Sequence, residues 1–335
     1  MFVAVGCPEP VARRVGDALV DANLVGHDSH GVIRIPQYVA AVRDGEVVPS
    51  AEPTVIRDTD AAALVDGQWG FGQVTAERAT RLAIEKAKAL GLGMAGAVRC
   101  NHIGRVGEYS EMAAQSGVVA FVTTGGFGGR GGRAAPFGGR EGVLGTNPLS
   151  FGFPGRDGTA MLVDFATTAV AAGKIAVARA KGEPLPAGSI LDKDGNPTNN
   201  AEDFYAGGVQ LPFGGHKGYA LQLVVELLGR VLTGADDYAE GNRGGPVYGH
   251  AGAVVLAIDA GVFRDADKVV EATEATLDRI RAVPPAPGFD RVMIPGEPEW
   301  STRAKREQAG LYVEDATVAA IKKTAAELGV ENTGL

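Results

Sequence analysis

The chain has 335 residues, of which 45% are hydrophobic and 21% are charged, and its formal net charge is −8. This length supports a large core in two domains or one large domain. The acidic balance argues against a nucleic-acid partner, because phosphate backbones are bound by clustered Lys and Arg.

Two patterns that would direct the protein to a membrane or out of the cell are absent from the sequence. No apolar stretch approaches the roughly 20 residues of a membrane span, and the start of the chain lacks the pattern of a signal peptide. Cys7 and Cys100 are too few for a disulfide framework. These features predict a cytoplasmic protein without a membrane partner.

Hydrophobic periodicity predicts helices and strands that alternate irregularly along the chain. The predicted helices cover residues 8–25, 36–45, 74–91, 105–115, 168–181, 216–234, 265–283 and 315–328. The predicted strands cover residues 92–99, 117–125, 160–167 and 251–263, and the glycine-dense stretch 125–145 is predicted to be a loop. No GxGxxG motif opens a helix after a strand, so the Rossmann fingerprint is absent.

The first candidate site is Ser29-His30-Gly31, which is followed by Arg34 and Tyr38. In a helix, positions 30, 34 and 38 share one face. That face would present a proton donor, a guanidinium for a carboxylate and a phenol, which are groups that reduction of a 2-keto acid requires. A capped helix start with a surface arginine is the alternative interpretation.

Two more candidates follow predicted strands. His102 lies in NHIG at 101–104, where an imidazole could exchange a proton near neutral pH. Asp164 lies at the end of a buried strand, and a buried carboxylate requires a partner. Pairing with an imidazole N–H would fix the tautomer of a catalytic histidine. The alternatives are a structural histidine and a helix N-cap.

A candidate cofactor contact lies in GGHKGYAL at 214–221. The two glycines allow the backbone to approach a ligand, and Lys217 supplies a positive charge for a phosphate or ribose. The N-terminus of the following helix adds to that charge. A glycine-marked helix start with a solvated lysine is the alternative. The spacing of His and Cys residues predicts no metal site.

Taken together, these segments resemble the malate/L-lactate dehydrogenase-like superfamily, which is unrelated to the Rossmann-type lactate and malate dehydrogenases. The group includes sulfolactate, ureidoglycolate and 2,3-diketogulonate enzymes and the Δ1-piperideine-2-carboxylate reductases. The resemblance spans nearly the whole chain in family order. It is carried by residues 21–38, 101–109, 145–154, 163–175, 191–198, 211–228 and 294–297.

The resemblance implies an α/β fold of non-Rossmann type. A large, mostly antiparallel cofactor-domain sheet with flanking helices would span residues 61–264 and bind NAD or NADP. A second domain, concerned with substrate and dimer contacts, would be formed by both chain ends, residues 1–60 and 265–335. The resemblance also implies a homodimer whose sites lie near the subunit interface.

The resemblance implies the following site roles. His30 would be the proton donor, relayed by Ser29 and oriented by Asp164, while His102 is the alternative proton donor. Arg34 and Tyr38 would bind the substrate carboxylate, and Arg140 would replace a substrate-binding lysine of the family. The implied cofactor contacts are Thr124, Asp164, Phe165, Ala166, Lys217, Gly218, Gly296 and Glu297.

The implied activity is NAD(P)H-dependent interconversion of a small 2-keto acid and 2-hydroxy acid, of the malate, lactate or sulfolactate type. Two alternatives remain open, a reductase of a cyclic 2-imino acid and an inactive ligand-binding homologue. Arg130, Arg133 and Arg140 favour a dianionic substrate or a 2′-phosphate on the cofactor.

Overall fold

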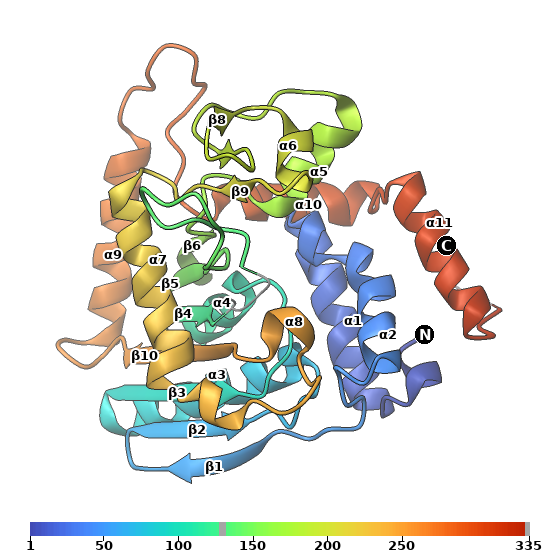
Figure 1. The fold of residues 1–335 in the computed structure, drawn as a ribbon. Helices are drawn as coiled ribbons and strands as arrows, with labels where there is room; N and C mark the ends of the chain where they lie inside the picture. Colours follow the sequence, from blue (N-terminus) through green and yellow to red (C-terminus); the bar gives the residue numbers. More distant parts are fainter. Residues whose placement is uncertain (127–131, 332–335) are drawn as a thin grey trace.

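A seven-stranded sheet in the order β1-β2-β3-β10-β4-β5-β6 forms the centre of the molecule (Figure 1). The computed structural model describes residues 1–126 and 132–331. Neighbouring strands are antiparallel except β2 and β3, which run parallel. The expected large, mostly antiparallel sheet is therefore confirmed. Its strands are β1 Thr54–Asp58, β2 Ala62–Asp66, β3 Leu92–Val98, β4 Val118–Gly125, β5 Leu149–Gly155, β6 Gly158–Phe165 and β10 Gly252–Asp259.

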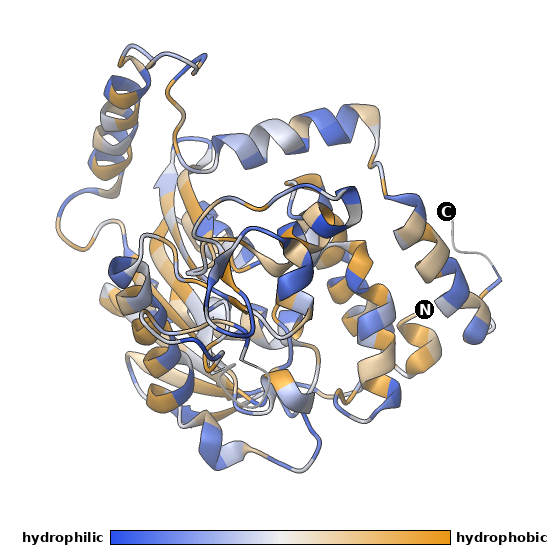
Figure 2. Ribbon diagram, turned by 45° about the horizontal axis from the view of Figure 1, so that its top comes forward, coloured by the Kyte–Doolittle hydropathy of each residue, from blue (hydrophilic) through white to orange (hydrophobic). Residues whose placement is uncertain are grey.

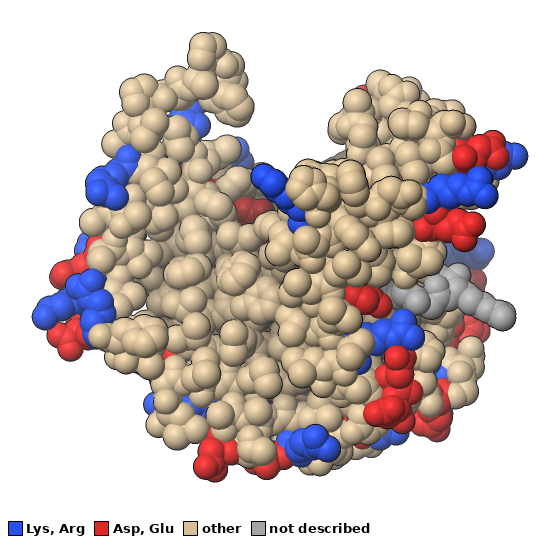
Figure 3. All heavy atoms as spheres, turned by 60° about the vertical axis from the view of Figure 1, so that its left-hand side comes forward, with Lys and Arg blue, Asp and Glu red and all other residues tan. Residues whose placement is uncertain are grey.

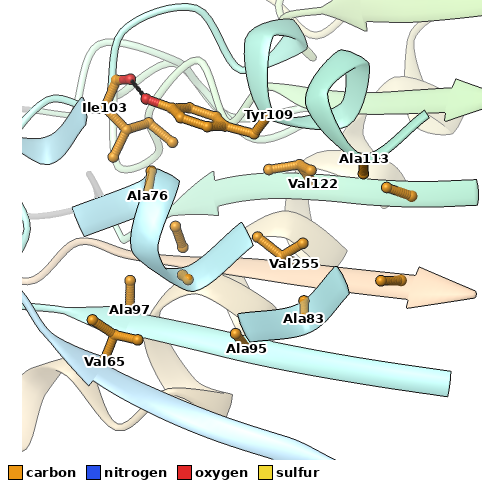
Figure 4. Packing of buried hydrophobic residues seen from close by; sticks show 14 of the residues in the cluster. Val65, Ala76, Ala83, Ala95, Ala97, Ile103, Tyr109, Ala113, Val122 and Val255 are labelled. Carbon is orange, nitrogen blue, oxygen red and sulfur yellow. Dashed lines mark hydrogen bonds between the residues drawn. The ribbon is translucent and has the colours of Figure 1, made fainter. Parts of the chain in front are cut away.

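Helices α3 (Gly72–Leu90) and α4 (Gly107–Gln115) cover one face of this sheet. The contact between α3 and the sheet is built from small side chains on both sides, as Figure 4 shows for Ala76 and Ala83 against Ala95 and Ala97. A Cβ at Gly93 would lie 2.2 Å from the carbonyl oxygen of Ala83. Small residues therefore allow helix and sheet to approach closely, and they make up much of the core.

The opposite face carries α7 (His216–Glu226), which continues as a single π-helical segment from Leu227 to Leu232. Gly229 lies where a Cβ would be 2.4 Å from the backbone nitrogen of Gly125. This glycine allows the π-helical segment to lie directly on strand β4. No described helix combines the length and the apolar character that crossing a bilayer requires.

The two chain ends pack together beside the sheet. Helices α1 (Glu9–Leu24) and α2 (Ile35–Arg43) come from the N-terminus. Helix α10 (Glu297–Ala309) contacts α1, and α11 (Asp315–Glu327) contacts α2. Their shared core includes Phe2, Leu19, Val39 and Phe71, with Leu328 packed against it. Helix α10 is hydrophilic along most of its length (Figure 2), and none of its residues is buried.

A smaller three-stranded sheet lies in the segment between β6 and α7. It comprises β8 Pro197–Thr198, β7 Ile190–Leu191 and β9 Val209–Gln210 in that order. Helices α5 (Ala172–Lys181) and α6 (Ala201–Tyr205) pack with it around a separate cluster that includes Ile175, Ile190 and Phe204. The remaining helices are α8 (Gly245–Tyr248) and α9 (Ala266–Arg281).

Candidate active site

The Ser29-His30 segment is a pair of 3-10 turns, Asp28–His30 and Val32–Arg34, joined by Gly31 and leading into α2. The expected single helical face over positions 30, 34 and 38 is therefore wrong. The side chain of Asn23 intervenes, because its Oδ1 accepts a 2.8 Å hydrogen bond from the Val32 amide. A Cβ at Gly31 would lie 2.1 Å from that oxygen, so the turn requires glycine.

The turn nevertheless brings His30 against His102. The two imidazole rings stack with centroids 5.4 Å apart and planes 17° apart. Ser29 Oγ lies 3.1 Å from His30 Nδ1, and the Tyr38 hydroxyl lies 2.6 Å from His102 Nδ1. Gln73 Nε2 donates a 2.9 Å hydrogen bond to the same hydroxyl. The structure thus places four of the predicted residues in one cluster.

Burial keeps both imidazoles from charging. Burial, with the nearby Arg34 guanidinium, lowers the pKa of His30 to about 3 and moves the pKa of His102 well below its usual value. A neutral ring has one donor and one acceptor nitrogen. Gln73 donates to the Tyr38 oxygen, so a tyrosine hydroxyl that donates to His102 Nδ1 would place the ring proton of His102 on Nε2.

Arg34 is held in place at the edge of this cluster. Its Nε donates a 2.6 Å hydrogen bond to the Ser29 carbonyl, and its Nη1 donates a 2.7 Å bond to the Gln37 side chain. Burial lowers the pKa of both imidazoles, and the charge of Arg34 acts in the same direction. A guanidinium fixed beside two neutral imidazoles can bind an anion next to a proton donor.

Asp164 faces a different imidazole from the one expected. Its Oδ2 accepts a 2.9 Å hydrogen bond from the Gly107 amide and lies 3.9 Å from His27 Nδ1. Burial raises the pKa of Asp164, while His27 and Arg105 act in the opposite direction. Within the described contacts, Asp164 is therefore positioned by His27, whereas the Nδ1 of His30 is positioned by Ser29.

The expected cofactor residues on β6 and α7 lie side by side. The Phe213 amide donates a 3.0 Å hydrogen bond to the Thr167 carbonyl, and the rings of Phe165 and Phe213 meet edge to face at 5.4 Å. Asp164, Phe165 and Ala166 are thus adjacent to the start of α7, where Lys217 is exposed. A Cβ at Gly218 would lie 1.9 Å from the Phe213 carbonyl oxygen, so this junction requires glycine.

The other residues expected to contact the cofactor are Gly296, Glu297 and Thr124, and each contacts a different part of the protein. The Leu162 amide donates a 3.0 Å bond to the Pro295 carbonyl, which places Gly296 against β6, but the Glu297 carboxylate accepts a 2.6 Å bond from Arg281 Nε. The Thr124 hydroxyl is buried and donates a 3.0 Å bond to the Gly252 carbonyl.

The expected arginines of the glycine-rich segment lie apart from the imidazoles in the contacts that the structure describes. Arg140 is exposed and packs beside Gly195. The Arg133 guanidinium stacks 3.8 Å above the Phe204 ring and donates a 2.9 Å bond to the Phe204 carbonyl. Arg130 lies outside the described residues.

Four residues at or near the site had no predicted role, namely His27, Gln73, Arg105 and Tyr248. His27 lies between Asp164 and Glu299 Oε1, which is 3.5 Å from its Nε2. Arg105 is buried and bridges Asp21 and Glu111, each at 3.0 Å. The Tyr248 ring lies 5.6 Å from that of His102. The GHDSHG sequence could have drawn attention to His27, but the other three offered no signal.

Comparison with known proteins shows the family of the chain. A family model described as malate/L-lactate dehydrogenase matches residues 1–322. An L-lactate dehydrogenase of Cupriavidus necator is 40% identical over 304 residues, which is 89% of this chain and 86% of that protein.

Two solved structures share the fold. The sulfolactate dehydrogenase of Methanocaldococcus jannaschii has a TM-score of 0.88 at 34% identity, over 98% of this chain and 94% of that one. A Δ1-piperideine-2-carboxylate reductase of Pseudomonas syringae has a TM-score of 0.82 at 30% identity, over 96% of this chain and 95% of that one.

The sheet topology and these relatives define an oxidoreductase that interconverts 2-hydroxy acids and 2-keto acids without a Rossmann fold. The chain belongs to the malate/L-lactate dehydrogenase family, which confirms the resemblance drawn from its sequence.

Proposed function

We propose that this enzyme reduces a small 2-keto monocarboxylate, and oxidises the matching 2-hydroxy acid, with the His30–His102 pair moving the proton and Arg34 binding the carboxylate. The observation that carries the proposal is the stacking of the two imidazoles, with Arg34 hydrogen-bonded to Ser29, the residue that contacts the His30 ring. Reduction at C2 requires a proton at the carbonyl oxygen and an anchor for the carboxylate, and this cluster supplies both.

Substrate binding itself would prepare the proton donor. The Arg34 charge contributes to the low pKa of both rings. A carboxylate bound to Arg34 offsets that charge, so the imidazole pair accepts a proton more readily once substrate is present. Two imidazolium ions in stacking contact repel each other, so the pair holds one proton and delivers it to the C2 oxygen.

The residues around the end of β6 suit a nicotinamide cofactor, which supplies the hydride when bound. Phe165 is 40% exposed and offers an apolar surface beside Asp164. Lys217 and the backbone amides at the start of α7 offer positive charge for the cofactor phosphates. Thr124 lies on β4, and Gly296, which precedes α10, lies against Leu162 of β6 in the same sheet. Rates with NADH and with NADPH distinguish the two possible cofactors.

The charges around the imidazoles favour one carboxylate on the substrate. Arg133 is engaged by Phe204, and Arg105 is engaged by Asp21 and Glu111. Burial raises the pKa of the Tyr248 phenol, Arg34 opposes this, and Glu46 acts in the same direction as burial, so Glu46 is a negative charge that would oppose a second substrate carboxylate on this side. These contacts support a monoanionic substrate over the dianionic one that the arginine count favoured.

Reduction of a cyclic 2-imino acid is the second candidate. Similarity to the piperideine carboxylate reductase supports it, and the same guanidinium and imidazoles would serve a C=N bond. The two activities differ in the electrophile and share the carboxylate anchor.

We further propose that the enzyme is a homodimer in the cytoplasm. Apolar residues are exposed at helical spacing along α7 and its π-helical continuation, namely Leu221, Val224, Leu227 and Val231. Figure 3 shows that the face on which α7 and α9 lie is mostly uncharged, with charged side chains toward its edges. Contiguous apolar surface of this kind favours association. The free, buried cysteines support a reducing compartment.

We also propose that residues 61–264 form the cofactor domain, with residues 1–60 and 265–335 in the second domain. The contacts of α1 with α10 and of α2 with α11 support this division, and the hydrophobic cluster of the N-terminal helices includes Leu328 from the C-terminal end. Strand β1 pairs with β2, so the sheet takes in residues from Thr54 onward.

Steady-state rates with NADH and NADPH across pyruvate, oxaloacetate and Δ1-piperideine-2-carboxylate test the proposed function. We expect kcat/KM to be greatest for pyruvate with one of the two cofactors. A preference for oxaloacetate would contradict the single-carboxylate proposal, and turnover of the cyclic imine alone would favour the second candidate. Cofactor binding without turnover of any substrate would indicate an inactive homologue. Light scattering should report a dimer that Leu227→Asp weakens.

A further inference from the structure

The segment 239–250 is fixed against the end of α2 by backbone-directed hydrogen bonds. The Gly244 amide donates to the Glu46 carbonyl at 3.0 Å, and Arg243 Nη1 donates to the Gly45 carbonyl at 2.7 Å. The Asn242 side chain adds a 3.2 Å bond to the Asp44 carbonyl. These bonds tie a connection that leads into β10 to the N-terminal helices.

Two consecutive glycines allow this close approach. Gly244 and Gly245 have φ angles of +73° and +58°, which favour glycine. A Cβ at Gly244 would lie 2.7 Å from the Trp69 ring, and a Cβ at Gly245 would lie 2.5 Å from the Glu46 carboxylate. The backbone of this segment therefore lies directly against Trp69 and Glu46, a few residues before Tyr248.

Tyr248 also lies beside His102. Among the described contacts of this imidazole, His30 stacks on it and Tyr38 bonds to its Nδ1. The Tyr248 ring lies at 5.6 Å and is tilted by 51°. Arg34 lowers the pKa of Tyr248, against the larger effect of burial, so the phenol also lies within electrostatic range of the guanidinium.

Each of the three groups on the reacting carbon of the substrate would face a different part of the site. The C2 atom of a 2-keto acid carries an oxygen, a carboxylate and a side chain. The imidazoles take the oxygen and Arg34 takes the carboxylate, so the substrate side chain is directed toward another wall of the site. Among the described residues, Tyr248 presents an aromatic ring to His102 from outside the N-terminal segment, with ring centroids 5.6 Å apart.

We propose that the ring of Tyr248 is a specificity-determining residue that limits the size of the substrate side chain. This inference rests on the proposed reduction of 2-keto acids. The segment that carries the ring is hydrogen-bonded to the Asp44, Gly45 and Glu46 carbonyls, so the ring cannot retreat easily and added methylenes would collide with it. One methylene in a fitted pocket changes kcat/KM by about 10–200-fold.

The test compares kcat/KM for pyruvate, 2-oxobutyrate and 4-methyl-2-oxopentanoate in Tyr248→Ala, Tyr248→Phe and the wild type. We expect Tyr248→Ala to raise the ratio of branched substrate to pyruvate by about 10-fold or more. Tyr248→Phe should leave that ratio within about threefold, because it keeps the ring. Tyr238→Ala is the matched control, since Tyr238 lies in the 3-10 turn Ala235–Tyr238, earlier in the same connection.

The possible failures are distinguishable. Turnover by the wild type with an unchanged ratio in Tyr248→Ala would overturn the size-limiting role. An equal loss in Tyr248→Phe and Tyr248→Ala on every substrate would also overturn it, because the hydroxyl would then be the important group. If Tyr248→Ala fails to fold, Tyr248→Leu provides the same comparison. Absence of wild-type turnover with every 2-keto acid would instead refute the proposed function.

Discussion

The rings of His30 and His102 stack at a centroid separation of 5.4 Å, although they come from the N-terminal turns and from the loop after β3. This contact makes the two residues one unit, because the charge state of each ring affects the other. It also explains why neither histidine can be assigned a role in isolation.

Acid should destabilise the enzyme through this pair. Burial, followed by the charge of Arg34, lowers the pKa of His30 to about 3 from an ordinary value of 6.5. The unfolded chain therefore takes up a proton below pH 6.5 that the folded chain does not, so stability falls as the pH drops from about 6.5 toward 3. His102 adds to this effect in the same direction.

Thermal unfolding measured between pH 7 and pH 4.5 checks this expectation. The loss of Tm on acidification should be smaller in the double variant His30→Gln, His102→Gln than in the wild type. His216→Gln is the control, because His216 is exposed at the start of α7 and outside the imidazole pair. Parallel plots of Tm against pH for the wild type and the double variant would show that the imidazole pair does not cause the loss of stability in acid.

Tyr38→Phe should lower both stability and turnover. The change removes the 2.6 Å bond to His102 Nδ1 and leaves the Gln73 amide without its acceptor. An unsatisfied buried donor costs about 1–3 kcal/mol. The tautomer of His102 depends on this hydroxyl. We therefore also expect kcat to fall about 10-fold or more, which is less than the loss expected when the acid–base group itself is removed. Urea unfolding and steady-state kinetics measure the two effects, and a change in stability alone would show that Tyr38 does not position the imidazole.

Arg34→Lys should mainly weaken substrate capture. A lysine ammonium cannot reproduce the fork that holds the Ser29 carbonyl and a carboxylate at once. We expect KM for the 2-keto acid to rise about 10-fold or more, with the dissociation constant of NAD(P)H unchanged. Arg43→Lys on the following helix is the control. An unchanged KM would show that the carboxylate binds elsewhere.

Lys217→Ala should weaken cofactor binding and leave the fold intact, since Lys217 is exposed at the start of α7. Loss of a charge-assisted phosphate contact costs about 1.5–3 kcal/mol, which corresponds to roughly 10-fold or more in Kd. Fluorescence titration with NADH and NADPH measures the change, with Lys322→Ala on α11 as the control. Equal Kd values in the two variants would remove Lys217 from the cofactor site.

Much of the fold could be predicted because long periodic segments carry a strong signal. Helices α1, α3, α9 and α11 fall within a few residues of their predicted ranges, as do strands β3, β4 and β10. Strands β1, β2 and β5 were missed. The exposed pattern of β1 and the Gly152 and Pro154 positions of β5 obscure the alternation that marks a strand.

Helix α10 was missed for a different reason. It buries none of its residues, so it lacks an apolar stripe, and it is held to the N-terminal segment by polar contacts such as Arg303 with Asp21 at 2.6 Å. Propensity and periodicity cannot reveal a helix that is positioned by tertiary ion pairs.

The sequence pointed to several residues that the structure brings together, but not to the contacts among them. The short motifs identified His30 and His102, yet the link through Tyr38 and Gln73 depends on α2 and α3 meeting in space. The partner of Asp164 likewise depends on where the turn after α1 places His27. Tyr248 could not be predicted, because its position follows from the Gly244–Gly245 contacts with distant residues.

The most direct test of the account is single-turnover reduction of pyruvate by His30→Ala and His102→Ala, with NAD(P)H binding measured in parallel. If the stacked pair supplies the proton, both variants should bind cofactor as the wild type does, and at least one should lose turnover by about 100-fold or more. Turnover within about threefold of the wild type in both variants would contradict the assignment of the proton to these imidazoles.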